Sequence, residues 1–261
     1  MNRIVHLPLL VLLLCALGLT TTESRAQGLG YGELQFGVQL SPTFSSFGTD
    51  NNFIDGDGTN LGLKLGVIAE YYFADNYSFH TGLGIHFNAG GGLFYDSRFT
   101  VVDIWRESLG DFLVTPPDQS DLIGGEYTYQ YDLSYLEIPV GLTLRTRQFG
   151  YINYYVRPQV ALGILTGANG TIERFPGLDS DEDFDISSEV NSLNLSWGIG
   201  VGAEYSVSTD TRLIGGLAFQ SGFTDVTDKN DTRVIRDGRM EGEDDSKATL
   251  RQIVITLGVM F

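Results

Sequence analysis

Apolar and polar side chains alternate along most of this chain with a period of two residues. Successive side chains of a β-strand point to opposite faces, so the pattern predicts strands with one apolar face and one small or polar face. Eight segments show it: residues 34–40, 61–73, 77–87, 136–144, 152–164, 193–207, 213–219 and 253–261. The sequence therefore predicts an all-β protein.

The connections between these segments alternate in length. Short turns lie at 74–76, 146–150 and 208–210, and long connections lie at 42–60, 89–126, 166–192 and 222–249. This alternation is typical of an antiparallel transmembrane β-barrel with short periplasmic turns and long external loops, whose strand number is normally even. We expect eight strands. Ten is the alternative, if Leu93 to Val102 or part of 229–240 forms further membrane strands.

A soluble β-sandwich would show the same alternation. In a sandwich, however, a second sheet covers the apolar face, and the loops have no reason to sort by length. In a bilayer the apolar face points to lipid, and the sheet must close because an open edge would leave backbone groups without partners. The barrel is therefore the favoured interpretation.

The N-terminal residues have the layout of a secretory signal peptide. Arg3 precedes an apolar run over 7–19, and a polar stretch ends at Ser24-Arg25-Ala26-Gln27, which predicts cleavage after Ala26. We expect a signal peptide over 1–26 and a barrel domain over 27–261. The single cysteine, Cys15, lies in the apolar run. A lipoprotein attachment site is the alternative for Cys15, but the preceding Leu14 is bulky where such sites require a small residue, so we expect a cysteine-free mature domain.

The chain is strongly acidic, with 33 Asp and Glu against 16 Lys and Arg and a net charge of −17. Such a chain repels phosphate groups, which disfavours nucleic acid as a partner. The four long connections hold most of the acidic residues, so the predicted membrane body is nearly neutral beneath an acidic outer surface.

Aromatic residues gather near the short turns, as expected for a girdle at the membrane interface. Ordinary β-propensity explains part of the same enrichment. The predicted girdle consists of Tyr71, Tyr72, Phe73, Tyr77, Phe79, Tyr151, Tyr154, Tyr155 and Tyr205.

Several ionisable residues fall on the inward face of the predicted strands. Glu33, Glu70, Arg145, Glu204 and Arg212 lie near the short-turn ends, and Lys64, Glu137 and Arg157 lie farther along. The interior of an eight-stranded barrel is just wide enough for side chains to fill, so we expect a packed, salt-bridged plug. A solute path lined by these charges is the alternative, and it would need more strands.

His80 and His86 share the inward face of one predicted strand. They are six residues apart, or roughly 20 Å, which is too far for both to bind one metal ion. Either histidine with a neighbouring carboxylate is a candidate general base. No nucleophile motif accompanies them, so we expect both to fill the interior, and the sequence predicts no catalytic, cofactor-binding or metal-binding residue.

Two acidic stretches, 55–60 and 179–185, present carboxylates at alternating positions. Calcium favours several oxygen ligands in such an arrangement, which makes these loops candidates for weak calcium binding. The glycine and the distal glutamate of a full EF-hand loop are missing. Solvated loop acidity is therefore the preferred interpretation.

Pro139 is unexpected within a paired strand, because proline removes a ladder hydrogen bond and a barrel has no free edge. Just before it, the aromatic positions change from odd (Tyr127, Tyr129, Tyr131 and Tyr135) to even from Leu136 onward. A β-bulge near Tyr135 explains both facts. Alternatively, the tyrosines lie above the membrane.

The stretch Tyr135-Leu136-Glu137-Ile138-Pro139-Val140-Gly141-Leu142, the Ala26-Gln27 junction and the terminal Phe261 resemble the PorT-like outer-membrane β-barrel family of Bacteroidota. This resemblance implies a barrel of eight to ten strands in the outer membrane, with some relatives linked to protein secretion. It supplies no catalytic residues.

Three hypotheses for function follow. The preferred one is a non-enzymatic barrel, surrounded by outer-membrane lipid, that presents acidic surface loops or assists an envelope or secretion complex through a protein partner. A narrow channel or small-solute transporter is the second, and a membrane-embedded hydrolase is the third.

The sidedness of the barrel is testable by cysteine labelling. Cysteines placed at Asn52, Asp181 and Asp244 should react with a membrane-impermeant maleimide on intact cells, because long connections of such barrels are external. Cysteines at Asp75 and Asp210 should stay protected. The opposite labelling pattern would invert the topology and move the acidic surface into the periplasm.

Overall fold

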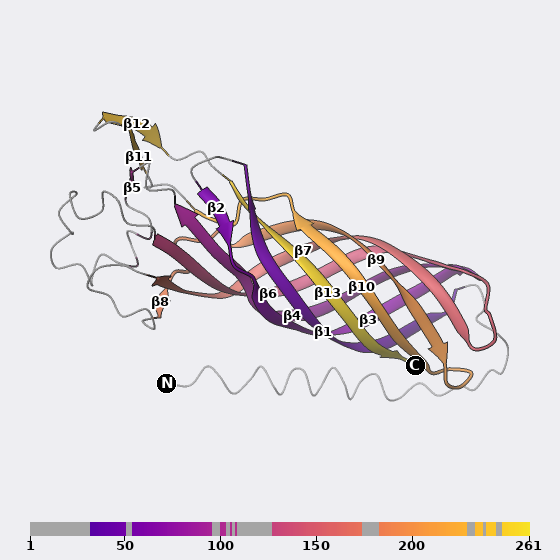
Figure 1. The fold of residues 1–261 in the computed structure, drawn as a ribbon. Helices are drawn as coiled ribbons and strands as arrows, with labels where there is room; N and C mark the ends of the chain where they lie inside the picture. Colours follow the sequence, from indigo (N-terminus) through magenta and orange to yellow (C-terminus); the bar gives the residue numbers. More distant parts are fainter. Residues whose placement is uncertain are drawn as a thin grey trace.

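Eight long antiparallel strands form a closed barrel in the computed structural model of the chain (Figure 1). The structure describes residues 32–50, 54–95, 100–102, 105, 108, 127–173, 183–228, 233–236, 239–243 and 247–261, and the expected signal peptide, 1–26, lies outside them. The barrel strands are β1 (Leu34–Thr49), β3 (Asn60–Ala74), β4 (Tyr77–Tyr95), β6 (Tyr127–Arg145), β7 (Ile152–Glu173), β9 (Leu193–Ser206), β10 (Arg212–Gly222) and β13 (Ala248–Met260). Each pairs with its neighbours in the chain, and β13 pairs with β1, which closes the barrel. The predicted eight-stranded barrel is confirmed.

Five short strands lie at the long-loop end of the barrel (Figure 1). β2 (Ile54–Asp57) pairs with β4, and β8 (Phe184–Asp185) pairs with β7. β5 (Thr100–Val102), β11 (Arg233–Arg236) and β12 (Arg239–Glu243) form a separate three-stranded sheet. The segments that would have raised the strand number to ten therefore extend β4 or build this small sheet. In the part of the chain that the structure describes, no helix is long and apolar enough to cross a bilayer.

The outer face of the barrel is apolar and exposed. Leu65 on β3 and Val201 on β9 are 41% and 53% exposed, and other large apolar side chains on the same faces of these strands, such as Val67 and Ile199, are exposed as well. Water would make such a continuous apolar band unfavourable, whereas lipid makes it favourable. The inside-outside assignment made from the sequence is therefore confirmed.

The predicted aromatic girdle is right for seven of its residues and wrong for two. Tyr71, Phe73, Tyr77, Phe79, Tyr151, Tyr154 and Tyr205 are exposed on the outer face. Tyr72 and Tyr155 are buried inside the barrel, because each lies between two outward-facing neighbours and the pleat turns it inward.

Strand β6 shows where the polarity of the two faces reverses. In its short-turn half, Val140 and Leu144 are exposed on the outer face. In its long-loop half, Tyr131 and Tyr135 are buried inside, while Asp132 is exposed outside. An apolar inside and a polar outside are typical of water-soluble β-structure, so this half of β6 extends beyond the lipid.

A register shift lies at the same level. Ser134 pairs with Gly167 of β7 and Tyr135 pairs with Leu165, so Thr166 is the extra residue. On the other side of β6, the register with β4 shifts between His86 and Ala89. The predicted bulge is thus at the right place but belongs to the neighbouring strands. In β6 itself, inward and outward side chains alternate without interruption. The aromatic residues change from odd to even positions because the odd-numbered tyrosines lie beyond the membrane, where the apolar face is the inner one.

Pro139 is accommodated without a bulge of its own. The ladder between β6 and β4 pairs Val140 with Thr81 and Glu137 with Gly84, and the register is unchanged across the two unpaired positions between them. The Thr81 hydroxyl donates a hydrogen bond of 2.9 Å to the Pro139 carbonyl oxygen. A side-chain hydroxyl therefore satisfies this carbonyl where the ladder is interrupted.

The lipid-facing assignment can be tested with arginine substitutions. Leu65→Arg or Val201→Arg should lower the free energy of unfolding by about 2–4 kcal/mol, because each places a charge near the middle of the lipid-facing band. Urea titration of the refolded protein in lipid vesicles measures this loss. Thr209→Arg, in an exposed short turn, is the control and should change stability by less than about 0.5 kcal/mol. Equal effects at Leu65 and Thr209 would show that the assignment is wrong.

Candidate functional site

The side chains inside the barrel form three layers between its short-turn end and its long-loop end. We call them the ion network, the middle cluster and the mouth core. The sequence placed most of the charged members on the inward face, and the structure shows which of them meet.

The ion network joins two carboxylates and three guanidinium groups. Glu70 forms ion pairs with Arg145 and, at 2.7 Å, with Arg157. Glu204 forms ion pairs with Arg145 at 2.9 Å and with Arg212 at 2.7 Å. All five side chains are buried. Removing one partner of such a pair typically costs about 3–5 kcal/mol, because a buried charge is left unpaired.

Neutral groups complete the ion network. The Tyr72 hydroxyl donates to Glu70 at 3.0 Å, and the Ser78 hydroxyl accepts from Arg145 at 2.7 Å. Gln35 accepts a hydrogen bond from Arg212. The guanidinium carbon of Arg145 also lies 4.8 Å from the centre of the Tyr72 ring, a cation–π distance.

The ion network confirms the predicted salt-bridged filling and changes two details. Arg157 joins Glu70, although the sequence placed it farther along the barrel. Tyr72 and Gln35 were missed as members, although both follow from the inward parity of their strands. Glu33, predicted to face inward, is half-buried and lies just before β1.

The middle cluster is built around Glu137. This carboxylate forms an ion pair with Lys64 at 2.7 Å, and one of its oxygens lies 3.4 Å from Nδ1 of the His86 ring. Lys64 also donates to Gln220 at 3.0 Å, and the other ring nitrogen of His86 lies 3.0 Å from the Thr43 hydroxyl.

The two histidines have separate partners, as their spacing predicted. His80 belongs to the ion-network side, where it contacts Gln159 at 3.1 Å and Thr143 at 3.4 Å. His86 belongs to the middle cluster. His86, rather than His80, is therefore the histidine with a neighbouring carboxylate.

Thr43, His86 and Glu137 follow one another in the order of a nucleophile, a base and an orienting carboxylate. Thr43 and His86 are completely buried, and neither lines the cavity described next. This chain of contacts therefore links three strands, and only its carboxylate, Glu137, reaches the cavity.

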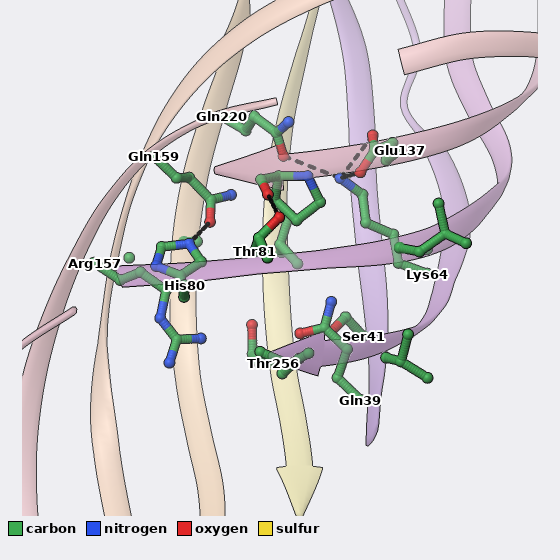
Figure 2. A pocket seen from close by; sticks show the side chains of 18 of the residues that line it. Gln39, Ser41, Lys64, His80, Thr81, Glu137, Arg157, Gln159, Gln220 and Thr256 are labelled. Atoms are coloured by element: carbon green, nitrogen blue, oxygen red, sulfur yellow. Dashed lines mark hydrogen bonds and ion pairs between the residues drawn. The ribbon is translucent and has the colours of Figure 1, made fainter. Parts of the chain in front are cut away.

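A central cavity of about 70 Å³ separates parts of the ion network from the middle cluster. Figure 2 shows Lys64, Glu137 and Gln220 on one side of it and His80 with Gln159 on another. Arg157 also lines the cavity.

The mouth core fills the long-loop end of the barrel with apolar and aromatic side chains. Its members are Phe47, Ile54, Ala89, Leu93, Trp105, Tyr129, Tyr131, Leu133, Tyr135, Ala168, Ile172, Phe184, Ile186, Val190, Val226, Ala248 and Leu250. They come from five barrel strands (β1, β4, β6, β7 and β13), from β2 and β8, from the segments next to β9 and β10, and from the long connection after β4. The core closes the barrel above the middle cluster.

Trp105 is the residue that the long connection after β4 adds to the mouth core. Its ring packs edge-on against Tyr129 and Tyr131 at centroid distances of 4.9 and 5.0 Å, and its indole N–H donates to the Tyr131 hydroxyl at 3.0 Å. A Cβ atom at Gly170 would collide with the indole ring, so only glycine leaves room there. Sequence reasoning missed Trp105, because it lies in a long connection, outside every strand whose alternation indicates an inward face.

The acidic loop stretches use some of their carboxylates locally. Asp57 accepts a hydrogen bond of 3.3 Å from Thr128. Asp185 accepts hydrogen bonds from the Ser187 hydroxyl at 2.6 Å and from its backbone N–H at 3.0 Å, which hold the pKa of Asp185 below its ordinary value. Residues 179–182 lie outside the described residues. Among those described, no three His, Cys, Asp or Glu side chains gather as metal ligands would.

Comparisons with known proteins agree with the barrel. Residues 23–228 match the family model for outer membrane protein beta-barrel domains. Similar solved structures include Neisserial surface protein A, at 13% identity and a TM-score of 0.43, covering 86% of this chain and 95% of that one. Ail of Yersinia pestis has 10% identity and a TM-score of 0.38, covering 89% and 100%. The protease OmpT from Escherichia coli has 7% identity and a TM-score of 0.45, covering 87% and 96%. No curated protein matches the chain.

Proposed function

Because this chain belongs to the outer membrane protein beta-barrel domain family and is an outer-membrane protein, we propose that it is a non-conducting, non-enzymatic barrel that presents a binding surface at its long-loop end. The filled interior is the observation that carries this proposal. An open channel needs a continuous aqueous path, whereas the ion network and the mouth core occupy both ends of the described barrel.

The long-loop end has the structure that a binding role requires. Strands β4, β6 and β7 continue beyond the polarity reversal, β2 and β8 pair with them, and β5, β11 and β12 add a second small sheet (Figure 1). The mouth core supports this extension from inside. The long connections also carry most of the acidic residues, which favours a partner with a basic surface.

The burial of the histidines supports a non-enzymatic role. A general base must come within hydrogen-bonding reach of the proton that it removes from a substrate. His86 is completely buried between Thr43 and Glu137, and His80 is buried beside Thr143. Access to either would require the packed interior to open.

The resemblance to PorT-like barrels favours an envelope or secretion complex as the setting. On this proposal residues 1–26 direct export and are removed, and the acidic long-loop end meets a protein partner. Calcium would then screen or bridge loop carboxylates rather than occupy a dedicated site.

Photo-crosslinking tests the proposed binding surface. A photoreactive amino acid at Thr59 or Ser188, both exposed at the long-loop end, should give discrete protein adducts in living cells. The same residue at Asp75 or Thr209, in the exposed short turns, is the matched control and should give none of these adducts. Adducts confined to the short turns would place the binding surface at the other end.

Planar-bilayer recording tests the channel alternative. The purified barrel should give no discrete conductance steps, since side chains fill it at two levels. Trp105→Gly should also stay closed, because it removes part of the mouth core while the ion network remains. Regular steps from the wild-type protein would contradict the proposal and favour a narrow channel.

A further inference from the structure

Four of the five basic residues in the eight barrel strands face the interior. Lys64 belongs to the middle cluster, and Arg145, Arg157 and Arg212 belong to the ion network. The fifth is Arg251 of β13, which is exposed on the outer face. A cation on this face is unfavourable near the middle of the membrane and tolerated near its interfaces, so the depth of Arg251 decides what it can do.

Cross-strand pairing places Arg251 at the edge of the lipid-facing band. The next outward row toward the short turns consists of exposed apolar residues: Phe44, Ile253, Phe219 and Ile199. The row of Arg251 itself consists of Ser46, Arg251, Ser221 and Trp197. Serine takes the place of an apolar residue on both sides of Arg251, and tryptophan is typical of a membrane interface. The row therefore lies at the interface of the long-loop end.

The side chain of Arg251 extends toward the long-loop end. Its guanidinium group lies against Gly48, where an added Cβ atom would be 2.2 Å from the guanidinium carbon. On β1, Gly48 lies two residues beyond Ser46, the backbone partner of Arg251, in the direction of the long loops. A long basic side chain extended in this way keeps its methylene groups against the apolar surface and its charge at the level of the lipid headgroups.

The guanidinium group of Arg251 has no counter-ion in the part of the chain that the structure describes. Each basic residue inside the barrel forms at least one ion pair, whereas no described Asp or Glu forms one with Arg251. Its planar set of N–H donors suits a phosphate group, because two parallel donors can bind two phosphate oxygens. At the level of the headgroups, the phosphate of a lipid is the acceptor within reach.

We propose that Arg251 binds the phosphate group of an anionic membrane lipid in the leaflet at the long-loop end. The acyl chains of this lipid pack on the neighbouring apolar row, against Phe44, Ile253 and Phe219. The acidic long connections repel anionic lipids, and Arg251 provides a local attraction where β13 lies between β1 and β10 (Figure 1). This lipid site is separate from the proposed binding surface and does not depend on it.

Fluorescence quenching by brominated lipid tests the lipid site. Trp197 lies in the row of Arg251, two strands away, whereas the other tryptophan, Trp105, is buried in the mouth core and gives a constant background. The barrel is refolded into phosphatidylcholine vesicles that contain a small fraction of dibrominated phosphatidic acid or, for comparison, of dibrominated phosphatidylcholine. Phosphatidic acid should be enriched about fivefold at Trp197, as expected for one basic residue at an anionic surface. Equal quenching by the two lipids would overturn the proposal.

Variants locate the bound lipid. Arg251→Gln removes the charge and should abolish the enrichment, whereas Arg147→Gln, at an exposed arginine of a short turn, should leave it unchanged. Arg251→Lys lacks the planar donor pair and should lower the enrichment. It also serves if Arg251→Gln does not fold, which the heat-dependent gel shift of a barrel reveals. Wild-type enrichment in the folded Arg251 variants would place the lipid elsewhere and overturn the proposal.

Free phosphate distinguishes a lipid site from a site for the phosphate group alone. An excess of inorganic phosphate should leave the enrichment unchanged, because inorganic phosphate has no acyl chains to pack on the apolar row. Loss of the enrichment in inorganic phosphate would show that phosphate alone fills the site and would overturn the assignment to a lipid.

Discussion

Every barrel strand of this protein must satisfy its backbone groups in a medium that contains no water. In lipid an unpaired N–H or C=O group costs several kcal/mol, so the sheet has to close on itself. The pairing of β1 with β13 achieves this closure. Closure then creates an interior too narrow for bulk water, and polar side chains placed there must find partners in one another. The ion network and the middle cluster follow from that requirement.

Strands β4, β6 and β7 are also long enough to leave the lipid, and their side chains record the change of solvent. On β6 the same inward parity carries Arg145 and Glu137 within the membrane body, then Tyr135 and Tyr131 beyond it. The backbone is continuous across this boundary. What changes is the medium at the outer face of the strand, which is lipid in the membrane body and water beyond it. The mouth core therefore resembles the core of a water-soluble protein, built on the end of a membrane barrel.

Much of the fold was predictable because the pleat allows only two directions for each side chain. Parity alone placed Glu70, Arg145 and Glu204 inside, and loop lengths ordered the strands. Parity does not give the stagger between neighbouring strands, so Arg157 was placed too far from Glu70. Trp105 could not be predicted, because a residue within a long connection has no pleat to direct it and its position depends on the space left by Gly170.

The extra residues in β4 and β7 lie at the level where the strands leave the lipid, beside Ser134. A bulge resets the register locally, so strand lengths on one side of it are independent of those on the other. Insertions or deletions in the extension can therefore accumulate without changing the stagger of the membrane-embedded part. The protein is in effect two modules on shared strands, and the extension is a natural place to graft another recognition surface onto an unchanged anchor.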